Sequence, residues 1–392
     1  MAKALNYLFA AKDWFLNLLN GQMFSYIIAH WKWIPVLLLG LYIGIKLLFW
    51  ILRFFYEINS AKKRVYMQIT MPREESQKDK EQATEKDFRE KIAIMAQLYR
   101  GLHEIMELNL WNLIMVWIFQ KDVISFEIHA KYKEITFFCS IDPYYAELLE
   151  KQVTSFYTNA SIEYLAPPKI QDAKIKTFLK SYYLYLKKES AYPIKTFKII
   201  ENDPLNDFTN VLSKLEENEK VAIQIMLRPV NDKWRKHARD VGTALFKGKK
   251  PHKFWNIPGM GILGWFFSAI VHGADEANKN YAPGAQHGDS YVRMLQADED
   301  LAKRIGEKAE DVGFETVIRV MASSDKGEDR CDTILSGIFV AFNSTKAADS
   351  NWFQSRRLLI IDSINSPIMS FSYEQRLFNF GEKKSILVPE EL

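Results

Sequence analysis

Residues 123–149 read VISFEIHAKYKEITFFCSIDPYYAELL and contain the clearest indication of the fold class. Apolar and polar residues alternate over 124–131, and the alternation resumes over 135–141 after a short turn. Alternation with period two is typical of β-strands, so the two runs predict a β-hairpin. Asp142 followed by Pro143 is a typical helix start, because aspartate caps free amide groups and proline fits the first turn. The stretch therefore predicts strand, strand and helix in succession.

The flanking segments extend this unit in both directions. Upstream, a short strand over 65–71 precedes a long helical pattern over 88–119. Downstream, the helix runs to about Tyr157, and a strand over 162–165 follows before two prolines. The order strand, helix, strand, strand, helix, strand is typical of a ferredoxin-like split βαβ sandwich.

The second half of the chain repeats this pattern in outline. We expect strands over 175–188, 221–227, 314–322 and 352–361, and helices from Asp203 onward, over 296–312 and over 328–342. The predicted fold class is α+β: an N-terminal transmembrane helix followed by two ferredoxin-like halves with an apolar insertion. The predicted domains are 1–59 (anchor), 60–170 (first sandwich) and 171–392 (second sandwich), with the insertion at about 247–295.

A long apolar run near the N-terminus predicts a membrane anchor. Residues 34–52 read IPVLLLGLYIGIKLLFWIL and contain one charge, Lys46. As a helix the run is about 28 Å long, close to the thickness of the bilayer's hydrocarbon core. It is longer and starts later than the core of a signal peptide, and it lacks the polar stripe of a soluble core helix. We expect a transmembrane helix from Ile34 to Leu52.

Charges beside the span predict its orientation. Arg53, Lys62, Lys63 and Arg64 follow it closely, whereas Lys3, Lys12 and Lys32 are spread over the preceding residues. The positive-inside rule then places the large C-terminal domain in the cytoplasm, at the cell inner membrane, after a single pass. An apolar pattern over 5–19, with several tryptophans nearby, predicts a further helix lying at the interface.

A basic segment followed by an aromatic one is the main candidate for a binding surface. Its cations are Lys233, Arg235, Lys236, Arg239, Lys247, Lys249, Lys250 and Lys253. The uncharged run over 254–270 follows and includes Trp255, Trp265, Phe266 and Phe267. Cations attract anionic headgroups and aromatic rings sit at the acyl boundary, so this order predicts contact with a membrane surface. A lid packed on its own domain and a site for nucleic-acid phosphates are the alternatives.

No motif predicts catalysis or a cofactor with good specificity. Gly259, Gly261 and Gly264 match G-x-G-x-x-G, but proline-containing sequence precedes them where a strand is required. Residues 242–250 depart from the spacing of a phosphate loop, and Lys250 stands where magnesium needs a hydroxyl. Gly288-Asp289-Ser290, with His272 and His287 nearby, lacks the frame of a hydrolase nucleophile. We therefore expect no cofactor.

The composition adds few constraints on function. The net charge of +4 over 392 residues does not by itself imply nucleic-acid binding. No histidine or cysteine spacing matches a zinc site. Cys139 and Cys331 lie in apolar periodic segments and are expected to be buried and reduced. His129 lies on the polar side of its strand and is expected at the surface.

The order of segments resembles the N-terminal region of membrane-anchored ATPases similar to type IV secretion and conjugation coupling proteins of small-genome bacteria. The likeness rests on the span ending FFYEI, the strands VISFEIHAK and EITFFCSID, the helix start DPYYAELLEKQV, and the pair DPLNDFTNVLSKL and EKVAIQIMLRP. The tail SILVPEEL looks like the linker before the nucleotide-binding domain of such proteins. This chain has no Walker A motif, so the resemblance implies the anchor and accessory half, with the ATPase lost or encoded separately and no catalytic residue carried over.

The expected function is a non-catalytic, membrane-anchored scaffold that docks a motor or DNA at the cytoplasmic face. Expected partners are anionic lipid headgroups, a separate ATPase or secretion-machine protein, possible DNA, and further copies of the chain. Two alternatives remain: a nucleic-acid-binding membrane protein, or a hydrolase or NTPase with an unrecognised motif. The Asp289/Ser290 loop and Lys249 would be the first residues to test for catalysis.

Overall fold

The computed structural model describes most of the chain after residue 33. Described are residues 34–70, 85–105, 123–132, 134–157, 159–166, 169–171, 176–198, 200, 203, 205–247, 296–344, 346–347, 349–359 and 362–392. The chain forms two compact units, Met1–Arg53 and Phe54–Leu392. The predicted interfacial helix over 5–19 and residues 248–295 of the predicted insertion lie outside the described residues.

The predicted apolar helix is present as α3 (Ile34–Ala61). Its large apolar side chains are exposed, as at Leu41, which is 62% exposed. The segment Leu39–Ala61 has a mean hydropathy of 1.6. By length and composition, α3 is the one helix in the described part of the chain that could cross a membrane. It continues nine residues past the predicted end at Leu52.

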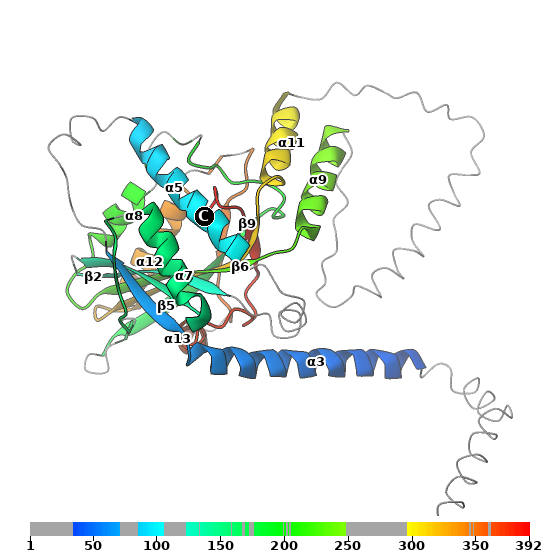
Figure 1. Ribbon diagram of the computed structural model, residues 1–392. Helices are drawn as coiled ribbons and strands as arrows, with labels where there is room; N and C mark the ends of the chain where they lie inside the picture. The colour runs from blue at the N-terminus through cyan, green and yellow to red at the C-terminus, as the bar shows by residue number, and fades with distance from the viewer. Residues whose placement is uncertain are drawn as a thin grey trace, which may run out of the picture. The chain divides into compact units, whose positions relative to one another are not determined.

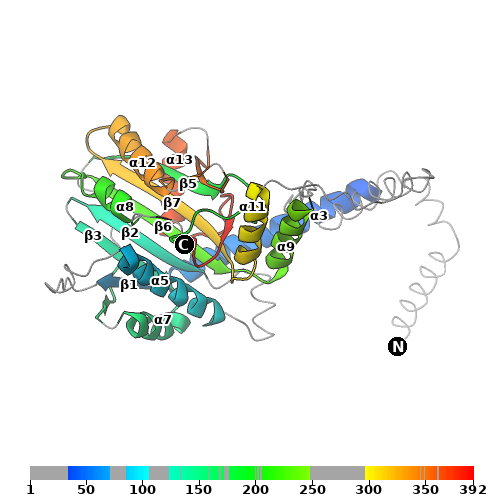
Figure 2. The ribbon, with the colours of Figure 1, turned by 90° about the horizontal axis from the view of Figure 1, so that it is seen from above.

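Nine strands of the described residues form one antiparallel sheet in the second unit (Figures 1 and 2). They are β1 (Val65–Thr70), β2 (Ile124–Lys131), β3 (Glu134–Ile141), β4 (Ser161–Glu163), β5 (Phe178–Leu186), β6 (Lys220–Pro229), β7 (Phe314–Ser324), β8 (Phe353–Arg356) and β9 (Ser385–Leu387). The order across the sheet is β4-β1-β3-β2-β6-β7-β5-β8, and β9 pairs with β7. β2 and β6 pair at the centre, so the strands before and after residue 170 share one sheet.

The two halves of the sheet repeat one arrangement. Read inward from each outer edge, the strands follow the order fourth, first, third, second. The helices also correspond: α5 (Glu85–Ile105) and α7 (Pro143–Phe156) connect strands of the first half, and α8 (Leu205–Leu212) and α12 (Glu328–Phe342) connect those of the second. In the first half a short hairpin turn connects the second strand to the third. In the second half the corresponding connection, from β6 to β7, contains α9 (Lys233–Phe246) and α11 (Gln296–Lys308).

The hairpin and helix predicted from residues 123–149 are confirmed. β2 and β3 pair antiparallel across their short turn. The Asp142 carboxylate accepts a hydrogen bond of 3.0 Å from the Tyr144 amide, and Pro143 opens α7. The local capping chemistry therefore begins this helix as the sequence indicates.

Some predicted boundaries differ from the structure. The helix predicted over 88–119 is described as α5 from Glu85 to Ile105, and residues 106–122 lie outside the described residues. The prediction of a last strand over 352–361 is wrong in length, because β8 ends at Arg356. The chain then turns and forms α13 (Asp362–Glu374).

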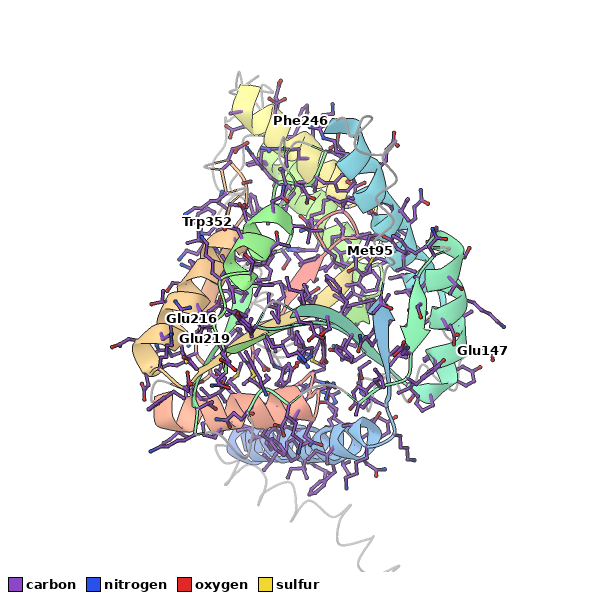
Figure 3. All side chains as sticks on the ribbon, turned by 90° about the vertical axis from the view of Figure 1, so that its left-hand side faces the viewer. Met95, Glu147, Glu216, Glu219, Phe246 and Trp352 are labelled. Carbon is purple, nitrogen blue, oxygen red and sulfur yellow. The ribbon has the colours of Figure 1, made fainter. Side chains whose placement is uncertain are left out.

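Helices α5, α7, α8 and α12 cover one face of the sheet (Figure 3). Buried apolar residues of these helices and of the strands form two clusters, one around Leu98, Leu102, Leu149 and Ile141, and the other around Leu184, Ile223, Val320 and Ile338. Ile225 of β6 packs against both clusters. The apolar sides of the alternating strands therefore form one continuous core.

Helix α13 covers the opposite face of the sheet (Figure 3). Its Tyr373 packs with Ala222 of β6 and Met321 of β7. The prediction that His129 is a surface residue is therefore wrong: His129 is only 6% exposed. Its strand turns polar side chains toward this face, as the alternation indicates, but α13 and the residues after it cover them.

Candidate functional site

Helix α9 presents most described cations of the predicted basic segment to solvent. The exposed ones are Lys233, Lys236, Arg239 and Lys247. Arg235 is half-buried, and its guanidinium donates hydrogen bonds to Asp232 at 2.8 Å and to the Glu310 carbonyl at 2.6 Å. The other predicted contact residues, Lys249, Lys250, Lys253, Trp255, Trp265, Phe266 and Phe267, lie outside the described residues.

Helices α9 and α11 lie side by side (Figures 1 and 2). Gly242 allows their close approach, because a Cβ there would lie 3.3 Å from the Ile305 side chain. Gly242 is inside a helix, so it does not open a phosphate-binding loop. Phe246, labelled in Figure 3, is 61% exposed at the end of α9. The exposed cations and the exposed Phe246 ring therefore lie on the helix that directly precedes residues 248–295 in the chain.

The C-terminal end of α3 is fastened within the second unit. The Glu57 carboxylate accepts hydrogen bonds from the Phe378 amide at 3.0 Å and the Asn379 amide at 3.3 Å, and a further one from the Asn379 side chain. The Phe54 ring stacks on that of Phe380, with centroids 6.4 Å apart. These contacts join the end of the apolar helix to the loop that follows α13.

A buried polar network lies under α13, centred on Glu127 of β2. The Glu127 carboxylate accepts two hydrogen bonds from Arg376, of 2.9 and 3.0 Å. Ser125 donates a bond of 2.8 Å to the same carboxylate, and Gln224 of β6 donates one of 3.0 Å. Glu127 is 2% exposed, so these donors replace the water it has lost.

His129 and Tyr373 complete the shell around Glu127. His129 Nε2 lies 3.1 Å from Glu127 Oε2 and 2.9 Å from the Tyr373 hydroxyl. The Tyr373 hydroxyl donates to the same carboxylate oxygen at 3.3 Å. An ionised carboxylate can only accept hydrogen bonds, so the His129 tautomer that fits carries its hydrogen on Nε2.

The network extends to Arg319 of β7, which is fully buried. Its guanidinium donates to Glu382 at 2.7 Å and to the Gln224 amide oxygen at 2.8 Å. It also donates to the Leu377 carbonyl. Gln224 therefore links two buried ion pairs, Glu127–Arg376 and Glu382–Arg319, across neighbouring strands.

The electrostatics keep Glu127 ionised. Burial by itself would raise the pKa of Glu127, but the Arg376 guanidinium and the His129 hydrogen bond lower it to about 2. Burial, together with the Glu127 charge, raises the pKa of Tyr373 well above its ordinary value. These groups are closed to solvent and bond mainly to one another, so the network holds α13 on the sheet.

A polar groove opens between β5, α12 and β8, with a volume of about 260 Å³. Lys180 lies in it and pairs with Glu328 at 3.0 Å and Asp332 at 3.1 Å. Arg356 and Arg357 line its rim and are exposed. Its lining combines these three cations with the Asp332 carboxylate, which also lies 4.0 Å from the Arg357 guanidinium.

The other predicted sites are only partly described. The described residues contain no group of three or more His, Cys, Asp or Glu placed to hold a metal ion. Cys139 and Cys331 are free and buried, as predicted, and burial raises the pKa of both thiols. The glycine motif at 259–264 and the Asp289/Ser290 loop with its histidines lie outside the described residues.

Local sequence patterns do not reveal the buried network. Ser125, Glu127 and His129 alternate with apolar residues, a pattern that also fits a solvent-facing strand side. Arg376, the cation that pairs with Glu127, lies 249 positions further along the chain. The one available signal was the placement of three polar groups on one side of a central strand.

The fold and site define an α+β protein with an antiparallel sheet, one exposed apolar helix and a closed polar core. The chain belongs to the family described as Domain of unknown function (DUF8128), which matches residues 56–350. No curated protein matches the chain. The family region begins within the end of α3 that belongs to the second unit.

Proposed function

We propose that the protein is a membrane-anchored, non-catalytic scaffold. The observation that carries this proposal is α3, whose segment Leu39–Ala61 is apolar and whose large apolar side chains from Leu39 to Leu52 are mostly exposed. Transfer of such a surface from water to lipid is strongly favourable, at roughly 25 cal/mol per Å² of apolar area. The closed network around Glu127 supports a structural role for the titratable groups of the core.

We place the helix across the cell inner membrane in a single pass, with the second unit in the cytoplasm. Lys62 and Lys63, which follow the helix directly, are exposed and available to anionic headgroups. Their position after the apolar helix supports this orientation through the positive-inside rule.

We also propose that each half of the sheet is a ferredoxin-like split βαβ sandwich. The repeated strand order and the matching helices support this interpretation. The halves would then be joined through their second strands, β2 and β6. In such an arrangement the α9–α11 excursion replaces a hairpin turn and is free to acquire a binding role.

The partner of the scaffold is proposed from the resemblance to secretion and conjugation coupling proteins. In this proposal the body docks a separate ATPase or a secretion-machine protein, and several copies assemble. The basic surface of α9 is the proposed contact with headgroups or with the partner.

Membrane extraction of the full chain tests the anchor. The wild-type chain should resist alkaline carbonate and dissolve in detergent. The double variant Leu41→Lys, Leu47→Lys should be released by carbonate, because each charge in a span costs about 3 kcal/mol. The control double variant Leu41→Ala, Leu47→Ala should stay in the membrane. Release of the wild-type chain by carbonate alone would contradict the proposal.

Photocrosslinking in native cells tests the scaffold role. A photoreactive residue at Lys236 or Lys247 should give one defined protein adduct with nucleotide-hydrolysing activity. The same residue at Lys151, exposed on α7, is the matched control. An ATP-hydrolysis activity in the purified chain itself would contradict a non-catalytic role.

A second candidate, nucleic-acid binding, is favoured by a cation cluster beside the edge strand β8. Lys187, Arg356 and Lys383 are exposed. Partial burial, together with the charges of Lys187 and Arg356, lowers the pKa of Lys383, and its ammonium lies 4.5 Å from the centre of the Tyr185 ring. Filter binding to single-stranded DNA should weaken steeply with salt and with Arg356→Ala, but not with Lys151→Ala, if this candidate holds.

A further inference from the structure

Helix α13 has two unlike sides. Its inner side is buried against the sheet through Asn365, Met369 and Tyr373. Its outer side carries an apolar stripe, defined here as Ile364, Pro367, Ile368 and Phe371, at helical spacing. Ile364 is 46% exposed and Phe371 is 42% exposed. An exposed apolar stripe of this kind indicates a surface that contacts another molecule or a membrane in the functional protein.

Ring contacts connect the stripe to the end of the apolar helix α3. The Phe371 ring lies 6.4 Å from the Phe380 ring, centre to centre. The Phe380 ring lies 6.4 Å from that of Phe54, stacked at an interplanar angle of 23°. All three residues belong to the second unit. The stripe is therefore continuous with the place where α3 joins this unit.

The position of Phe54 sets the depth of this region. Phe54 lies two positions after Leu52, where the predicted span ends, and seven positions before Ala61, where the apolar segment of α3 ends, so it belongs to the C-terminal end of the span. A residue in contact with Phe54 therefore lies at the level of the bilayer interface when the span crosses the membrane. Phe380 contacts Phe54 directly, and Phe371 contacts Phe380.

We propose that the stripe on α13 docks on the bilayer surface as an interfacial helix. This inference rests on the proposed membrane anchor and names a further lipid contact that the sequence pattern did not indicate. The occupant is lipid, because the stripe continues from the emerging helix and because exposed Lys62 and Lys63 at that helix end can meet anionic headgroups. The inner side of the same helix carries Tyr373, and the residue Arg376 just after it, into the buried network. One helix thus carries the proposed lipid contact on its outer side and packs against the sheet with its inner side.

Site-specific labelling of the full chain in vesicles tests the docking. An NBD fluorophore is attached through Phe371→Cys, and in a matched control through Val340→Cys on α12, which is 66% exposed on the opposite side of the sheet. The native thiols Cys139 and Cys331 are buried and should not react. The vesicles contain phosphatidylcholine and phosphatidylglycerol, with doxyl-labelled phosphatidylcholine as quencher. Quenching should be at least about threefold stronger at position 371 than at 340.

A second variant checks the apolar character of the contact. With the label at Ile364→Cys, adding Phe371→Glu should shift the emission toward that of the water-exposed label at 340. An unchanged circular dichroism spectrum shows that the variant is folded. No shift on adding Phe371→Glu would contradict the docking.

The remaining outcomes separate the possible failures. Equal quenching at 371 and 340, in chains that float with the vesicles, would overturn the docking and leave the anchor standing. An intermolecular disulfide between two copies of the Phe371→Cys variant, without lipid quenching, would show that a second copy covers the stripe and would also overturn it. Failure of both labelled chains to float would overturn the anchor and the docking together.

Discussion

Arg376 and Glu127 form a two-bond ion pair between residues 249 positions apart, with hydrogen bonds of 2.9 and 3.0 Å. Their side chains are 4% and 1% exposed. Both charges have lost their water, so removing either one leaves the other unpaired in a medium of low polarity. The pair fastens the residues after α13 to the centre of the sheet.

Removing Arg376 should be strongly destabilising. Arg376→Met leaves the Glu127 carboxylate buried without its cation and should lower the free energy of unfolding by about 3–5 kcal/mol. The double variant with Glu127→Gln should recover part of the loss, because no unpaired charge remains. Urea unfolding of the full chain in detergent measures both. Lys151→Met, which breaks an exposed pair with Glu147, is the control and should have no measurable effect. Equal effects of Arg376→Met and Lys151→Met would contradict this account.

Stability should fall in acid through Glu127. The pKa of Glu127 is about 2 in the folded protein, below its ordinary value of 4.5. The unfolded chain therefore binds the proton first, so the stabilisation is complete above about pH 4.5 and is lost as the pH falls toward 2. The Glu127→Gln variant should show a shallower loss over this window. Identical acid transitions for both proteins, followed by circular dichroism, would rule out this assignment.

Two glycines should respond to alanine in opposite directions. A Cβ at Gly313 would lie 2.5 Å from ring atoms of buried Trp234, so Gly313→Ala should destabilise by about 1–3 kcal/mol. A Cβ at Gly306, inside α11, would meet nothing within 4 Å. Gly306→Ala should therefore stabilise by up to about 1 kcal/mol, because alanine is the better helix former. Thermal unfolding of the two variants should shift the midpoint down and up, respectively. Shifts of both unfolding midpoints in the same direction would contradict these two expectations.

Glu57 should hold the loop after α13 in its folded conformation. Glu57→Ala removes the acceptor of the Phe378 and Asn379 amides, which should cost about 1–3 kcal/mol locally. Hydrogen exchange of residues 377–384 should become faster, whereas exchange in β6 should stay unchanged. Glu147→Ala on exposed α7 is the control and should leave both segments unaffected. Unchanged exchange over 377–384 in Glu57→Ala would mean that the loop is held by other contacts.

Local patterns predicted a large part of the fold. Alternation over 124–141 predicted the hairpin, and Asp142 with Pro143 predicted the start of α7. These predictions succeed because strand pairing across a short turn and helix capping depend on neighbours in sequence. The apolar run over 34–52, with its single charge at Lys46, likewise predicted α3, because a helix satisfies its backbone hydrogen bonds internally, as a lipid environment requires.

Helix α13 shows where local patterns are insufficient. Pro367 lies inside it, and serines recur along it, so its sequence indicates no helix. Packing of Met369 and Tyr373 on the sheet stabilises the helix against these preferences. The apolar stripe on its outer side could be recognised only after the helix itself was known.

The apolar helix α3, the α+β class and the side of β2 that each residue faces can be read from the sequence, because they follow from composition and from periods of two and 3.6 residues. Only the tertiary structure decided that the polar side of β2 is buried, so that His129 is closed in and Glu127 meets Arg376. Alternation assigns a side chain to a face, but whether that face meets water depends on what covers it. Here the cover comes from residues about 250 positions away, and no local pattern encodes that distance.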